Sequence, residues 1–306
     1  MSGYYLQQAF NAVFVGSFYS LLAVAYALVH TVTGRIVLCF GDLMTFGAMY
    51  AIYAFTLATT VGFFDPWILA PIFLVTVLGT ALTGAAVNRL ALAPLFGMPS
   101  QALMISSVGA GIVISETMRA ATGGREQWLS PMLTDTAIVL TGEPFSMRIN
   151  WMQLSMLCLD LALVALLFLA LNNTRIGRIW RATAEDHRLA QLSGIDTGRV
   201  VALSVATAAG FAAAAGYVLS VYYGGVSFYM GLVFGLKALF SSLIGGVGSI
   251  AGAVLGAFLL AGFETAWTTF FTSDYRDVAV FGLVLAIFLL KPEGLLGSSL
   301  RRDSSP

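Results

Sequence analysis

The 306-residue chain is 58% hydrophobic and only 10% charged, with no net charge and a mean hydropathy of +0.88. A soluble domain carries about 25% charged residues, so this composition excludes an ordinary soluble fold and favours a bilayer protein. The zero net charge gives no electrostatic footprint for nucleic acid, and Cys and His show no metal-ligand spacing.

Long apolar stretches follow one another along the chain, and a membrane-spanning helix needs about 20 such residues. The first stretch, 8–29, has no Lys or Arg before it, so we expect a retained span rather than a secretory signal. The stretches are continuous rather than alternating, which excludes the strands of a membrane barrel. In chain order the candidate spans are 8–29, 38–60, 67–88, 101–121, 151–171, 200–222, 231–245, 248–267 and 277–291.

The stretch 231–245 is short and contains Lys237, which predicts a re-entrant or broken segment near residues 231–250. The count is then eight or nine spans. We expect an all-α integral membrane protein, a polytopic bundle of eight or nine transmembrane helices that forms one domain over residues 1–306.

Lys and Arg in the loops predict the orientation, because cytoplasmic loops are enriched in both. With 172–199 in the cytoplasm and 231–245 crossing, ten basic residues lie inside and four outside. The N-terminus and the loop 122–150 are then extracytoplasmic, and the C-terminal tail, 298–306, is cytoplasmic and disordered. The inside set is Arg35, Arg89, Arg175, Arg178, Arg181, Arg188, Arg199, Lys291, Arg301 and Arg302; the outside set is Arg119, Arg125, Arg148 and Arg276.

Ionisable residues inside spans cost about 2.5–3.5 kcal/mol each on insertion scales and mark candidates for function. Asp42 lies just inside the second span, where it either caps the helix against its dipole or lines a pathway through the bundle. Asp160 lies mid-span and either faces a polar interior or is protonated. Lys237 either faces the pathway or pairs with Asp42 or Asp160.

Small residues predict close helix packing and one interruption. Gly245, Gly246 and Gly248 would weaken a continuous helix, which predicts a break or tight turn beside the pathway. Gly248, Gly252 and Gly256 recur every four residues, a spacing that lets membrane helices approach closely. The span 200–222 repeats this spacing at Ala206, Gly210 and Ala214.

The most polar long stretch is RIGRIWRATAEDHRLAQLSGID, residues 175–196. Its part 182–195 predicts a short amphipathic helix with Leu189 on the apolar side, Glu185 on the polar side and a stop at Gly194. Such a helix binds either lipid head groups or a groove of a soluble protein, and its acidic pair favours protein. Because nucleotide-binding and catalytic motifs are missing, a motor supplied by another subunit is expected.

Residues 173–196, NTRIGRIWRATAEDHRLAQLSGID, resemble the cytoplasmic loop of the branched-chain amino-acid ABC importer permeases. The resemblance continues through 34–53, 235–264 and 289–297. Family members commonly have Asn-Phe-Ala-His ahead of Gly-Asp, where this chain has Val-Leu-Cys-Phe at 37–40. Because of that departure, several substrates stay possible: a branched-chain or other amino acid, urea, an amide or an aromatic acid.

The resemblance implies a permease subunit in a bacterial inner membrane, without catalytic residues, metal or a cofactor of its own. Its partners would be a second permease, identical or related, two cytoplasmic ATPases that bind ATP and Mg, and an extracytoplasmic solute-binding protein. The rival hypothesis is an ion-coupled secondary transporter of a small polar solute, with Asp42, Asp160 and the glycine break at the midplane. Residues expected to couple to the ATPases are Arg178, Arg181, Ala184, Glu185, Asp186, Leu189 and Gly194.

Overall fold

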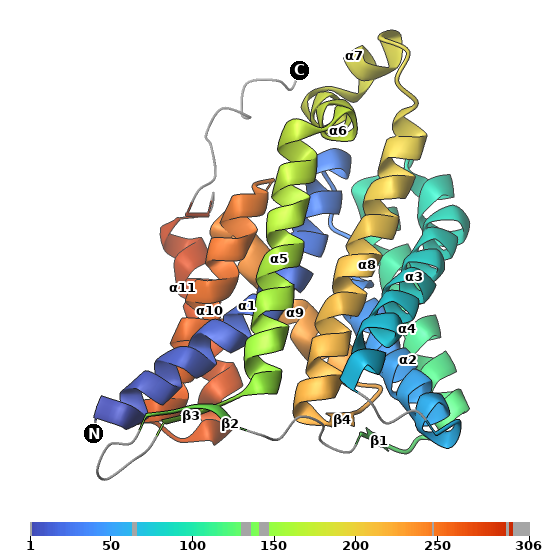
Figure 1. Cartoon of the computed structure of the whole chain (residues 1–306). Helices are drawn as coiled ribbons and strands as arrows, with labels where there is room; N and C mark the ends of the chain where they lie inside the picture. The colour runs from blue at the N-terminus through green and yellow to red at the C-terminus, as the bar shows by residue number, and fades with distance from the viewer. Residues whose placement is uncertain are drawn as a thin grey trace.

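The computed structural model describes residues 2–62, 66–129, 136–140, 147–246, 248–291 and 294–295; the predicted tail at 298–306 lies outside them. Within these ranges the chain is a bundle of long helices (Figure 1). The main helices are α1 (Ser2–Thr33), α2 (Phe40–Thr60), α3 (Leu69–Val87), α4 (Ser100–Thr122), α5 (Trp151–Asn173), α8 (Thr197–Tyr223), α9 (Met230–Gly245), α10 (Ile250–Phe270) and α11 (Arg276–Leu290). Short helical turns at Pro66–Ile68, Asn88–Leu92, Ala93–Leu95 and Ser273–Tyr275 flank α3 and precede α11.

Every predicted span is a helix in the structure, with bounds shifted by a few residues. By length and composition, seven helices in the described ranges are able to cross a membrane: α1, α2, α3 with its extension, α4, α5, α8 and α10. Helix α9 is apolar but shorter, with 16 residues or about 24 Å of rise, against a hydrocarbon core of about 30 Å. The prediction of an all-α polytopic membrane protein is confirmed.

Helix α1 forms the centre of the bundle. It packs against α8, α9 and α10, and 83% of its most apolar window is buried, against 22% for α3 and for α5. Its inner half is rich in alanine, at Ala23, Ala25 and Ala27, which are all fully or almost fully buried. Small side chains let several helices surround one axis, where lipid gives no hydrophobic drive for association.

Helix α8 approaches its neighbours so closely that glycine is required on one side of each contact. A Cβ at Gly47 of α2 would meet the backbone of Ala213, and one at Gly216 would meet the backbone of α2 at Met44 and Ala48. Gly84 of α3 meets Ala209 in the same way. Membrane helices gain van der Waals contact through such approaches.

Both predicted small-residue stripes need correction. Ala206, Gly210 and Ala214 line an apolar groove of about 300 Å³, whereas α8 makes its closest contacts through Ala209, Ala213 and Gly216. Gly248 lies before α10 with φ +90°, so it does not share a helix face with Gly252 and Gly256. Those two glycines do face α9, where a Cβ would meet the backbone at Gly245 and Ser241.

The two ends of the bundle differ. At one end the short helices α6 (Arg175–Glu185) and α7 (His187–Leu192) stand beyond α5 and α8 (Figure 1). The opposite end carries the N-terminus and the strands β1 (Gln127–Trp128), β2 (Thr136–Leu140), β3 (Met147–Asn150) and β4 (Gly225–Val226). Strand β1 pairs with β4 and β2 with β3, both antiparallel. The described residues of 122–150 therefore lie at the opposite end from 172–199, as the predicted topology requires.

We predict that Gly216→Leu lowers the melting temperature of the purified protein in detergent, because the new side chain pushes α8 away from α2. Overpacking of this kind costs about 1–3 kcal/mol of folding stability. The control is Gly282→Leu in α11, where a Cβ has nothing within 4 Å. Equal melting temperatures for the two variants would contradict the close α2–α8 contact.

Candidate functional site

Asp42 lies on a cavity of about 270 Å³ that is bounded by α1, α2, α4 and α9. Helix α2 begins inside the bundle, because the chain turns at Gly34 (φ +64°) after α1 and runs back through residues 35–39 before Phe40. This return places the first turn of α2, with Asp42, at the middle of α4 beside Gly111. The aromatic and polar side chains that line the cavity are Tyr26, Asp42, Ser115, Glu116, Phe228 and Tyr229.

Three glycines bring the start of α2 against the start of α9 at this cavity. A Cβ at Gly41 would meet the carbonyl of Gly231, and one at Gly231 or Gly235 would meet the backbone of Gly41. Neither helix has a side-chain cap at its N-terminus. The positive ends of two helix dipoles therefore lie close together inside the bundle.

The carboxylate of Asp42 has no side-chain partner among the described residues. Glu116, on the same cavity, is already paired with Arg119, whose Nη2 lies 2.6 Å from Oε2. A helix dipole stabilises an anion by about 0.3–1 kcal/mol, at most about 2, which is less than the insertion cost of about 2.5–3.5 kcal/mol. The dipole of α2 therefore contributes less than this insertion cost at the half-buried carboxylate of Asp42.

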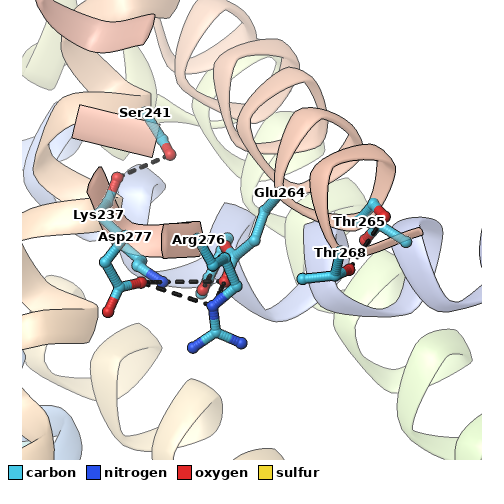
Figure 2. A network of polar contacts seen from close by, with 8 residues as sticks. Lys237, Ser241, Glu264, Thr265, Thr268, Arg276 and Asp277 are labelled. Carbon is cyan, nitrogen blue, oxygen red and sulfur yellow. Dashed lines mark hydrogen bonds and ion pairs between the residues drawn. The ribbon is translucent and has the colours of Figure 1, made fainter. Parts of the chain in front are cut away.

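Lys237 is held in an ion-pair network between α9, α10 and α11 (Figure 2). Its Nζ lies 2.9 Å from Oε1 of Glu264 and 2.8 Å from Oδ1 of Asp277, and its side chain is 1% exposed. Arg276 Nε lies 3.2 Å from the same Glu264 oxygen, and the hydroxyl of Tyr19 on α1 donates to Glu264 Oε2 at 3.0 Å. Two cations and two anions thus neutralise one another; Lys237 and Glu264 are buried, whereas the side chains of Arg276 and Asp277 are 44% and 47% exposed.

This network corrects the prediction for Lys237, which pairs with neither Asp42 nor Asp160. Sequence reasoning missed Glu264 and Asp277 as its partners. A signal was available in the sequence. The two stretches that follow Lys237 carry Glu264 and Asp277 near one end, and the predicted topology places both ends on the same side of the membrane.

Asp160 of α5 is fully buried against α1, away from the Asp42 cavity. Its Oδ2 lies 2.8 Å from Ser17 Oγ, which lies 2.8 Å from the carbonyl of Phe14. The Ser17 hydroxyl is placed to donate to the Asp160 carboxyl and to the Phe14 carbonyl, and this contact joins α5 to α1.

The predicted glycine break is a tight turn between α9 and α10. Helix α9 ends at Gly245, and Gly246 and Gly248 have φ of +116° and +90°. The hydroxyl of Ser249 then accepts from the N–H of Gly252 at 3.0 Å and caps α10. None of these three glycines lines the Asp42 cavity, so their part in a pathway stays a prediction.

The charged segment forms two helices rather than the single helix predicted over 182–195. Helix α6 begins where Thr174 Oγ1 accepts from the N–H of Gly177 at 3.2 Å, and it ends at Glu185. The side chain of Asp186 then accepts from the N–H groups of Arg188 (2.7 Å) and Leu189 (3.0 Å) and caps α7. An Asx cap inside a helical pattern favours a new helix start, and this local competition explains the error.

The α6–α7 pair presents a mixed charged and apolar surface at its end of the bundle. Leu189 and Leu192 are 62% and 85% exposed. His187 Nε2 donates to the carbonyl of Val32 at the end of α1 (2.6 Å), an anchor that sequence reasoning missed. Of the predicted coupling residues, Ala184 is half-buried and the others are exposed: Arg178, Arg181, Glu185, Asp186, Leu189 and Gly194.

Comparison with known proteins gives one consistent result. Residues 8–289 match the profile of the family described as branched-chain amino acid transport system / permease component. The high-affinity branched-chain amino acid transport system permease protein LivH of Salmonella typhimurium is 32% identical over 96% of both chains. The corresponding protein BraD of Pseudomonas aeruginosa is 30% identical over the same shares. An autoinducer 2 import system permease protein, LsrC of Yersinia pseudotuberculosis, is 28% identical over 61% of this chain and 52% of its own.

We predict that Lys237→Met destabilises the purified protein strongly, because removal of one member of a buried pair leaves an uncompensated charge and costs about 3–5 kcal/mol. The double variant Lys237→Met with Glu264→Gln removes one charge of each sign and should recover much of the melting temperature. If the double variant melts no higher than Lys237→Met alone, the two side chains are not an energetic pair.

Proposed function

The chain belongs to the family of branched-chain amino acid transport permeases, and from that premise we propose that it is the membrane subunit of an ATP-driven importer for branched-chain or related amino acids. The observation that carries this proposal, beyond the family, is the exposed α6–α7 pair anchored to the buried centre of the bundle. It offers a surface on which a soluble motor docks.

The proposed assembly has a second permease, identical or related, two ATPases that bind ATP and Mg, and a solute-binding protein. The ATPases dock at the α6–α7 end, which is then cytoplasmic, and the binding protein delivers solute at the end with the N-terminus and 122–150. The ten-to-four distribution of basic residues supports this orientation in a bacterial inner membrane.

The structure supplies two rigid connections from the α6–α7 surface to the bundle. Helix α6 follows α5 directly at Thr174, and a Cβ at Gly177 would meet the backbone of Leu171, so α6 is held against the end of α5. His187 holds α7 to the end of α1. We propose that ATP-dependent movement of the ATPases displaces α6 and α7, and through them α5 and α1, with Arg178, Arg181, Glu185 and Leu189 at the contact.

An ion-coupled secondary transporter is not favoured. Its coupling site would need carboxylates at a shared midplane position, but Asp160 lies against α1 while Asp42 lies on the cavity at α9. The relatives over nearly the whole chain are permease proteins of transport systems.

The test uses proteoliposomes. They contain this chain, any second permease, and the ATPases and binding protein that are encoded beside it. We predict that uptake of L-leucine, L-isoleucine or L-valine requires ATP inside the vesicles and the binding protein outside. Uptake that is driven by an ion gradient in the absence of ATP would overturn the importer proposal.

We predict that Glu185→Arg combined with Leu189→Arg abolishes co-purification of the ATPases, because both changes alter the exposed α6–α7 surface without touching the Asp186 cap. Glu126→Arg is the matched control, an exposed charge reversal at the opposite end. Normal ATPase recovery with the double variant, or loss with Glu126→Arg, would place the docking surface elsewhere.

A further inference from the structure

The cavity at Asp42 combines an anion, aromatic walls and a size suited to a small solute. Its volume of about 270 Å³ lies just below the range of roughly 300–1,000 Å³ typical of drug-sized ligands, which fits a molecule the size of an amino acid. Tyr26, Phe228 and Tyr229 contribute to the walls, and the side chain of Tyr229 is 66% exposed where the cavity opens. Such a site is able to admit a solute from outside this chain.

The charges of the surrounding residues leave Asp42 as the one unpaired acid on this cavity within the described ranges. Glu116 is paired with Arg119. The ammonium of Lys237 does not reach Asp42, because it forms ion pairs with Glu264 and Asp277. Asp42 is half-buried, and a carboxylate that is partly withdrawn from water gains from a cation beside it, so a positive group in the cavity would complement the charge of the site.

We propose that Asp42 binds the ammonium group of the transported solute and that this solute is an α-amino acid. The proposal rests on the proposed function and adds to it a recognition group in the permease itself. The ammonium pairs with the Asp42 carboxylate, and nearby aromatic side chains add cation–π attraction and apolar contact for the solute's side chain.

The same site offers a place for the solute's carboxylate. The N-termini of α2 and α9 meet at Gly41 and Gly231, of which Gly231 lines the cavity, and neither helix has a side-chain cap. Interrupted membrane helices that direct their N-termini at an anionic group are a recurrent means of solute recognition. A zwitterion therefore satisfies both the acid and the helix ends, whereas urea, a neutral amide or an aromatic acid leaves Asp42 without a cation.

The test compares Asp42→Asn with the unchanged chain in the complete transporter in proteoliposomes, with L-leucine, L-isoleucine and L-valine as probes. We expect ATP-dependent uptake to fall at least about tenfold, since loss of one member of a hydrogen-bonded charge pair weakens binding by that much or more. Assembly and ATP hydrolysis without solute should stay normal. Asp42→Glu, which keeps the charge, should retain measurable uptake.

Asp274→Asn is the matched control, the same substitution at an exposed acid that lies outside the cavity, and uptake should stay close to that of the unchanged chain. Equal uptake by Asp42→Asn and the unchanged chain overturns this inference and leaves the importer intact. ATP-dependent import of only urea or benzoate by the unchanged chain also overturns it. Absence of ATP-dependent uptake of any of these solutes overturns the proposed function instead. If the Asp42→Asn variant fails to assemble, the KM for amino-acid uptake is measured with Asp42→Glu instead. A KM equal to that of the unchanged chain then overturns the inference.

Discussion

The ammonium of Lys237 is buried where neither water nor lipid can neutralise it, and the arrangement of the C-terminal helices depends on that constraint. Glu264 on α10 and Asp277 on α11 lie within 2.9 Å of its Nζ, and Tyr19 joins Glu264 to α1. Breaking the contact between Lys237 and Glu264, which are 1% and 8% exposed, leaves an uncompensated charge in a low-dielectric interior. The network therefore fixes three helices around the central α1 with a definite rotation. Close glycine and alanine contacts fix α2, α3 and α8 on the other side.

This fixed centre separates the two proposed functions in space. One end carries α6 and α7, whose exposed leucines and charges are suited to a soluble partner. The interior between α1, α2, α4 and α9 holds the Asp42 cavity. Helix α1 contacts both regions, because His187 of α7 bonds to its last turn and Tyr26 lines the cavity. We propose that a displacement of α7 reaches the cavity wall through this one buried helix.

The sequence predicted the helices well because bilayer thickness dictates the length of each apolar stretch, and all nine stretches are helices. It did not predict helix rotation, so the stripe at Ala206, Gly210 and Ala214 was assigned to packing although Ala209 and Ala213 make the close contacts. The partners of Lys237 lie on other helices, so spacing within one helix does not identify them; only the predicted topology, which places both acids toward one side of the membrane, pointed to them. The break at Asp186 depends on a cap that competes locally with a longer helix. Asp42 was identified by its charge, but its cavity depends on the meeting of α2 and α9.

The central claim is that ATPases dock on α6 and α7, and photo-crosslinking tests it most directly. A photoreactive amino acid is placed at Leu192, which is 85% exposed on α7, or at Trp128, which is 71% exposed at the opposite end. After illumination of the assembled transporter in membranes, we predict a covalent adduct of this chain with an ATPase subunit from position 192 and none from position 128. An ATPase adduct from position 128, with none from position 192, would contradict both the docking surface and the proposed orientation.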